Sequence, residues 1–321
     1  MWKRSRSSIR VLAAGLQRLG FTAACLLASV VVAQEPEAKP GQAEAIQESV
    51  AKLEELVAKA EALWKSGDQA AAREACKAAL AAAGLDGATP EWLAAADRVL
   101  WRLGRSAYRA GELQTAHDAR NAVYSHRNST LPDDHPDLQT ARASLAITKK
   151  ALGDLRGALE LQEQVLAVRT RTLPDEHADL QTARANLALT KKALGDLRGA
   201  LALQEQVLAV RTRTLPDEHI DLQTARGNLA LTKKALGDLR GALALLEQVL
   251  AVRTRTLPDD HPDLQKARGN LALTKKALGD LRGALALLEQ VLAVRTRTLP
   301  DEHPDLQSAR ANLAATKKAL G

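Results

Sequence analysis

The chain has 321 residues, of which 46% are hydrophobic but only 2% are aromatic, and its formal net charge is +7. A protein built on β-sheets would use more aromatic and β-branched residues, so this composition favours helices that pack closely through Leu and Ala. Five basic residues and no acidic ones occur in the first 33 positions, and without them the net charge falls from +7 to about +2. Such a near-neutral remainder argues against nucleic-acid binding.

The first 33 residues have the order expected of an export signal. A basic stretch, MWKRSRSSIR, leads to the apolar run FTAACLLASVVVA, which is too short to span a bilayer as a helix. We therefore expect a signal peptide at 1–33, cleaved after Ala33, and a polar linker at 34–45. An uncleaved membrane anchor and a lipoprotein site at Cys25 are the alternatives. Cleavage leaves Cys76 as the single cysteine, which we expect to be a small buried helix residue without a disulfide.

A 42-residue repeat occupies most of the remaining sequence. The stretch TKKALGDLRGAL occurs four times in register, and one histidine recurs at the same interval, at His135, His177, His219, His261 and His303. The segments 172–213 and 214–255 agree at 39 of 42 positions. Such a repeat predicts an array of similar structural units.

Each unit is predicted to contain a helix, a tight turn, a second helix and a loop. Leu180, Leu187 and Leu194 lie on one face of a first helix from about 179 to 194. Gly195 suits a left-handed helix end, and Asp196 suits the N-cap of a second helix that ends near 213. The following TLPDEH loop contains a proline that stops the helix and acidic residues near the start of the next one.

This unit resembles the tetratricopeptide repeat, in the 42-residue form found in kinesin light chains. The residues that match the motif in order and spacing are Leu187-Ala188, Gly195, Ala200 and Val207-Leu208. The loop DDHPDL at Asp133 and Asp259 also matches the family's loop. The motif's usual aromatic positions hold Lys191, Leu197 and Gln204, so leaner packing is expected.

The resemblance extends from about residue 46 to the end and implies an all-α fold. The expected architecture is a right-handed superhelical solenoid of antiparallel helix pairs, stabilised by contacts between neighbouring repeats. We expect two degenerate repeats at 46–132 and four near-identical repeats at 133–300. The last segment, 301–321, is expected to be either a capping helix or the mark of a truncated chain.

No sequence motif for catalysis, phosphate binding or dinucleotide binding occurs, so we expect no enzyme activity and no cofactor. Equivalent histidines cannot share a metal ion, because neighbouring helices lie about 8–10 Å apart. Asp175, Glu176 and His177 of one loop could bind a metal weakly, but a solvated turn explains them better. The lysine pair before each turn is expected to complement the negative end of its helix.

The resemblance places the binding surface in a concave groove lined by the first helix of each pair. Counting back from the turn glycine predicts two ladders of groove residues, with Lys150 at the start of the second: Asn186, Asn228, Asn270 and Asn312, and Lys192, Lys234, Lys276 and Lys318. An Asn can bond both backbone groups of an extended peptide, and a Lys can hold a carboxylate. The alternative is that these residues only keep the groove soluble.

The same count in the degenerate repeats selects a patch of aromatic and basic residues. Its members are Trp64, Arg98, Trp101, Arg102, Arg105, Tyr108 and Arg109. Trp, Tyr and Arg are the residue types that dominate binding hot spots. The alternative is that the two tryptophans pack against neighbouring helices.

We therefore expect an exported scaffold, periplasmic or secreted, that binds an extended peptide or partner helix with an acidic segment. No nucleic acid is expected as a partner, and no membrane beyond the export signal. Near-identical repeats with exposed terminal faces could also associate end to end. The alternative function is a targeting or regulatory module of a larger enzyme, linked to a peptidase or a kinase, whose catalytic domain is absent from this chain.

Overall fold

A computed structural model describes residues 41–321, so the predicted signal peptide and most of the predicted linker lie outside the described residues. The described part contains thirteen α-helices, one short 3₁₀ helix and no strand. Not one of its helices is both long enough and apolar enough to cross a bilayer. The elements are α2 (Gln42–Lys65), α3 (Gln69–Ala83), η1 (Leu85–Gly87), α4 (Pro90–Ala110), α5 (Leu113–Thr130), α6 (Pro136–Ala151), α7 (Leu155–Thr172), α8 (Ala178–Ala193), α9 (Leu197–Thr214), α10 (Ile220–Ala235), α11 (Leu239–Thr256), α12 (Pro262–Ala277), α13 (Leu281–Thr298) and α14 (Pro304–Leu320).

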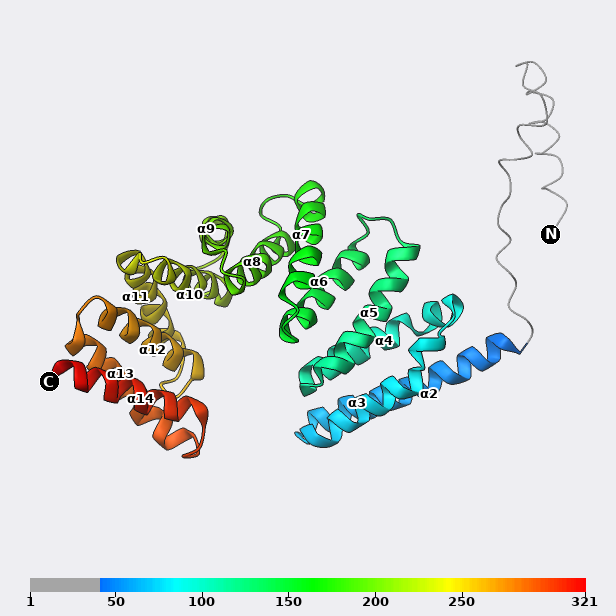
Figure 1. The fold of residues 1–321 in the computed structure, drawn as a ribbon, viewed down its shortest axis with the longest axis horizontal. Helices are drawn as coiled ribbons and strands as arrows, with labels where there is room; N and C mark the ends of the chain where they lie inside the picture. The colour runs from blue at the N-terminus through cyan, green and yellow to red at the C-terminus, as the bar shows by residue number, and fades with distance from the viewer. Residues whose placement is uncertain (1–40) are drawn as a thin grey trace, which may run out of the picture. The chain divides into compact units, whose positions relative to one another are not determined.

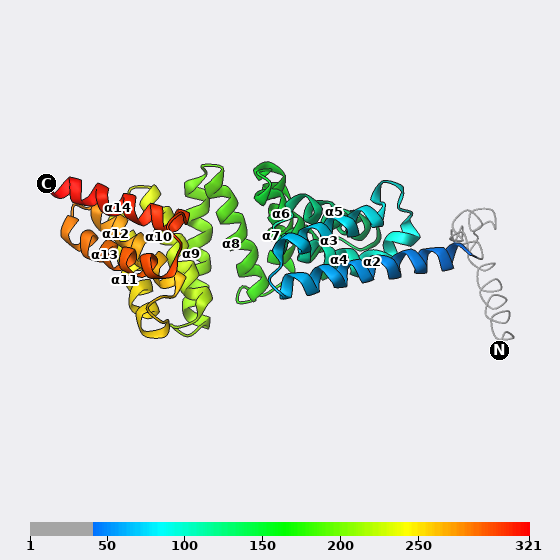
Figure 2. The ribbon, with the colours of Figure 1, turned by 90° about the horizontal axis from the view of Figure 1, so that it is seen from below.

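The second of the two units of the chain is compact and extends from Val50, inside α2, to Gly321. Within the second unit, from α4 onward, each helix packs against the next one in the sequence, as Figures 1 and 2 show. The helices form antiparallel pairs, and each pair packs on the following pair. This arrangement confirms the predicted all-α solenoid of helix pairs.

The turn inside each pair is built by a glycine and an aspartate. Gly195 has a φ of +88°, a left-handed conformation that favours glycine. Asp196 then caps α9 by accepting a hydrogen bond from the Gly199 amide at 2.8 Å. A Cβ at Gly199 would clash with that carboxylate, which explains the second glycine of the GDLRGAL stretch. The predicted helix end and N-cap are therefore confirmed.

The loop histidine caps the next helix. Nδ1 of His177 accepts a hydrogen bond from the Asp179 amide at 3.1 Å, and the same contact recurs at every regular repeat. In the described part of the chain, no group of three or more His, Cys, Asp or Glu side chains is arranged to hold a metal ion. The histidine is therefore the N-cap residue, a position that Ser, Thr, Asp or Asn usually occupies.

The predicted apolar stripe of the first helix is buried except at its end. Leu180 and Leu187 are 1% and 3% exposed, but Leu194 is 39% exposed. The prediction was wrong for Leu194, because α8 ends at Ala193 and the leucine is already the C-cap residue. Ala200 and Val207 of α9 complete the core of the repeat. Cys76 is buried as expected, and its burial raises the pKa of the thiol to about 11.

Candidate functional site

A groove runs between the first helices of neighbouring regular repeats. One cavity of about 140 Å³ has walls from α6 and α8, including Ser144 and Asn186, and a floor from α7 that includes Gln162. The next interval has a much smaller cavity of about 10 Å³, between Asn228 of α10 and Gln204 of α9. First helices therefore form the walls and second helices the floor, and this surface is called the groove below.

The asparagine ladder lies along the groove, and two of its members line the two cavities. Asn186 and Asn228 line the two cavities, and Asn270 and Asn312 are half-buried at the equivalent positions of α12 and α14. Within residues 41–321, none of these four side-chain amides makes a hydrogen bond. Each retains two donors and one acceptor oxygen for a bound chain.

The two lysines before each turn have different surroundings. Lys191 lies 3.3 Å from Asp196 and 3.6 Å from Glu163, so its charge is paired. Lys192 is half-buried, and no acidic group of the described chain lies within ion-pair distance of it. Burial lowers the pKa of Lys192, as it does for Lys150 and Lys234. The ladder lysine is thus a partly desolvated cation without a partner.

On α4, the predicted patch is divided between paired and unpaired arginines. Arg102 donates to Glu54 at 3.0 Å and to Glu61 at 2.8 Å, which ties α4 to α2. The hydrogen bond from Arg102 to Glu61 lowers the pKa of the Glu61 carboxyl. Arg98 is exposed and lines an open cavity of about 430 Å³ beside the Glu54 pair.

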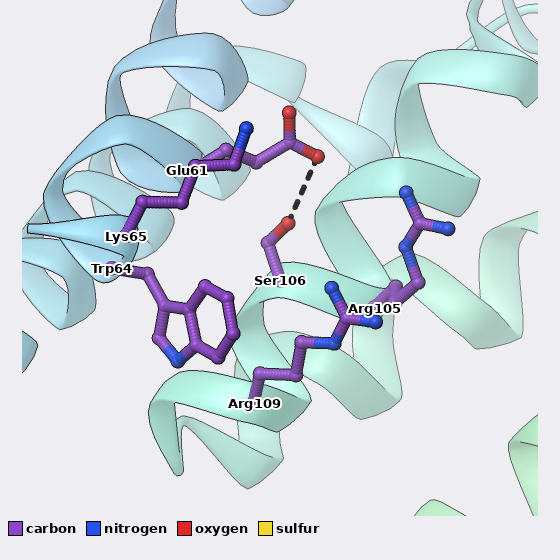
Figure 3. A pocket seen from close by; sticks show the side chains of 6 residues that line it. All are labelled: Glu61, Trp64, Lys65, Arg105, Ser106 and Arg109. Carbon is purple, nitrogen blue, oxygen red and sulfur yellow. Dashed lines mark hydrogen bonds between the residues drawn. The ribbon is translucent and has the colours of Figure 1, made fainter.

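A pocket of about 110 Å³ brings together residues of α2 and α4 (Figure 3). Trp64 is 37% exposed, and the Arg109 guanidinium lies 5.4 Å from the centroid of its ring. Ser106 and Glu61 also line the pocket, and the Ser106 hydroxyl donates to Glu61 at 3.2 Å. The Arg105 guanidinium points away from the indole (Figure 3). The pocket therefore combines an aromatic surface with basic side chains.

The two other aromatic residues of the patch are covered by arginines of α5. Trp101 is half-buried, 5.4 Å from Arg127, and Arg127 is held by two hydrogen bonds to Asp97. Tyr108 lies 4.7 Å from Arg120. The sequence count missed both arginines because it considered only first helices. Arg127 could have been found, since its register position holds Arg169 and Arg211 in later repeats.

The predicted site residues thus lie in several separate parts of the structure and do not form one site. Trp64, Arg105 and Arg109 line one pocket between α2 and α4, and Arg102 pairs with Glu61 of the same pocket. Trp101 and Tyr108 face α5. The asparagine ladder extends over the first helices α8, α10, α12 and α14, and the lysine ladder begins one first helix earlier, at Lys150 of α6. The assignment of all these residues to partner binding stays a prediction.

The comparisons with known proteins concern mainly the regular repeats. A family model of the tetratricopeptide repeat matches residues 179–255 and 221–297, and another of the same description matches residues 138–179. None of the curated proteins compared with the chain matches it.

Several solved structures resemble the chain. Nearly identical repeats of kinesin light chain type from Podosopora anserina are 33% identical, with 64% of this chain and 97% of that one covered and a TM-score of 0.56. BtubC (BKLC) from P. vanneervenii is 18% identical, with 81% and 95% covered and a TM-score of 0.56. A tetratricopeptide repeat protein from Parabacteroides merdae is 20% identical, with 83% and 87% covered and a TM-score of 0.55. The last two share the fold alone.

Proposed function

The chain belongs to the tetratricopeptide repeat family, with repeats of the kinesin light chain type, and on this basis we propose that it is a non-catalytic scaffold whose groove holds an extended segment of a partner protein. The family fold is that of a protein–protein interaction scaffold. The first 33 residues support export of this scaffold, to the periplasm or the cell exterior. The domain limits drawn at residues 33, 45, 132 and 300 belong to the same proposal.

The observation that carries the proposal is that four lysines of the ladder are half-buried and have no acidic partner among the described residues: Lys150, Lys192, Lys234 and Lys276. Lys318, the last of the ladder, is exposed. Keeping a cation partly out of water is unfavourable unless an anion compensates it. The neighbouring Lys191 has its own carboxylates, so an unpaired Lys192 is not a general consequence of lysine at a helix end. Repetition of this lysine along the groove supports a partner segment with acidic side chains.

The asparagines support an extended partner. Their unbonded amides recur at the same register of successive first helices, and each can both donate to and accept from a peptide backbone. The pocket at Trp64 and Arg109 supports a further contact at the N-terminal end, because an aromatic surface beside arginines suits a buried anchor.

The test compares two sets of lysine variants on the full chain. The probes are capped, fluorescein-labelled peptides of alternating Glu and Ala, or of alternating Gln and Ala, and fluorescence anisotropy gives their dissociation constants. Replacing Lys192, Lys234 and Lys276 with Gln should weaken the Glu–Ala peptide about tenfold, because each lost pair contributes about 0.5 kcal/mol.

The matched control replaces the paired lysines, Lys191, Lys233 and Lys275, with Gln. These variants remove the same charge one residue away and should leave the dissociation constant nearly unchanged. Equal weakening by the two sets would mean that only net charge matters, and it would refute a specific lysine ladder.

A further inference from the structure

Arg120 of α5 is a buried cation without a carboxylate partner. Arg120 is 9% exposed, and two other arginines are similarly buried, Arg142 at 7% and Arg169 at 9%. Those two ion-pair with Asp133 and Asp179, whereas no acidic group of the described chain pairs with Arg120. Burial of an uncompensated charge costs free energy, so the position calls for an explanation.

The hydrogen bonds of Arg120 leave one edge of its guanidinium unused. Nη1 donates to the Ser144 carbonyl at 3.0 Å and to the Thr148 hydroxyl at 2.5 Å, both on α6. The Tyr108 ring of α4 covers one face at 4.7 Å. Nε and Nη2 make no hydrogen bond within the described residues, and neither atom is completely buried. Two adjacent N–H donors in one plane match the two oxygens of a carboxylate.

The fold does not need an arginine at this position. The same register holds Gln162, Gln204, Leu246 and Leu288 in the later repeats, all buried. The structure even makes room for Arg120, because a Cβ at Gly104 would clash with its Cγ. The later repeats have Ala at the register of Gly104 and a smaller side chain at that of Arg120.

Arg120 lies at the floor of the groove. Its counterparts Gln162 and Gln204 line the two groove cavities, and Arg120 itself bridges the first helices α4 and α6. Lys150, also half-buried and unpaired, is on the same α6 wall. In this interval, Arg127 is paired with Asp97, whereas neither Arg120 nor Lys150 has an acidic partner among the described residues.

We propose that Arg120 is an anion-binding residue of the groove, which holds a carboxylate side chain of the partner segment between α4 and α6 through Nε and Nη2. This inference rests on the proposed function, since it assumes that a segment lies in the groove. It adds the place at which the register of that segment is fixed. The floors of the two cavities described above also have a guanidinium, but those of Arg169 and Arg211 are paired with Asp179 and Asp221.

The test is Arg120→Gln, which installs the side chain found in the next two repeats. Binding of the Glu–Ala peptide should weaken tenfold or more, because a charge-assisted bidentate contact is lost. Binding of the Gln–Ala peptide should not change, and the melting temperature should stay equal or rise. Arg120→Lys keeps the charge but loses the fork, and it should give a smaller loss.

Unchanged binding of the Glu–Ala peptide to Arg120→Gln would overturn the inference. So would equal weakening of both peptides together with a lower melting temperature, which would indicate a structural role. If the Lys192, Lys234 and Lys276 variants weaken the Glu–Ala peptide but Arg120→Gln does not, the proposed function survives without this inference. If Arg120→Gln weakens it and the lysine variants do not, a carboxylate binds at Arg120, and the lysine ladder that carries the proposed function is refuted.

Discussion

In the first helix pairs, several ion pairs between helices have no counterpart in the other described repeats, whereas from α6 onward the same contacts recur every 42 residues. Arg102 joins α4 to α2 through Glu54 and Glu61, and Arg127 joins α5 to α4 through Asp97. No later repeat has this acidic pair facing an arginine at the register of Arg102, where Ser or Asn stands instead.

The regular repeats use one arrangement many times. Asp175 accepts hydrogen bonds from Arg184 at 2.6 Å and Arg213 at 2.8 Å, which closes a repeat on itself. Arg211 donates to the Asp221 carbonyl at 2.9 Å, which joins that repeat to the next one. The free energy of unfolding of such an array is approximately the sum of the stabilities of its repeats and of the interfaces between neighbouring repeats, and these contributions are nearly equal along the regular repeats. Individual residues are therefore more informative about function in the first pairs and at the few positions where the regular repeats differ.

The largest expected effect concerns one of those differences. Leu246 is 1% exposed and packs with Ala230, Ala242 and Leu271, whereas the same position of the preceding repeat holds Gln204. We expect Leu246→Gln to lower the free energy of unfolding by about 2–4 kcal/mol, because it removes apolar contacts and buries an amide. Chemical denaturation of the full chain measures this.

The reverse substitution is the matched control. Gln204 is 4% exposed, and neither Nε2 nor Oε1 has a hydrogen-bond partner among the described residues. Gln204→Leu should raise the free energy of unfolding by about 1–3 kcal/mol. A loss of stability in this variant would contradict the view that the two repeats have interchangeable cores.

A smaller effect is expected in the first pairs. Glu61→Gln removes the charge that pairs with Arg102 and keeps the shape of the side chain. Because both side chains are about a quarter exposed, we expect a loss of about 1 kcal/mol. Hydrogen exchange should show the faster opening in α2 and α4 and no change beyond α7. Equal destabilisation of all repeats would show that the first pairs are coupled to the whole array.

The repeated features were predictable from the sequence because the pattern supplies several independent signals for each. Gly195 and Asp196 could be assigned because turn chemistry requires such residues between two apolar stripes. His177 could not be assigned as a helix cap, since histidine is not among the usual capping residues. Arg120 was missed because its importance depends on what faces it from α4 and α6, and spacing alone does not contain that information.

The smallest expected effect is a pH dependence that belongs to the regular repeats. Hydrogen bonds from Arg184 and Arg213 lower the pKa of Asp175, and Arg226 and Arg255 lower that of Asp217. A carboxyl with a depressed pKa in the folded state stabilises the fold above its unfolded pKa of about 4 and loses this contribution as the pH falls through the folded value.

The contribution of these carboxylates to the melting temperature should therefore be lost as the pH falls below about 4. Each carboxylate is exposed, so single contributions are small and screened by salt, and only their repetition makes the sum measurable. Replacing Asp175 and Asp217 with Asn should make the fall of the melting temperature at low pH smaller without moving the pH at which it occurs. Glu61→Gln should leave most of that fall unchanged. A fall between pH 8 and 6 would instead assign the pH dependence to groups other than these carboxylates.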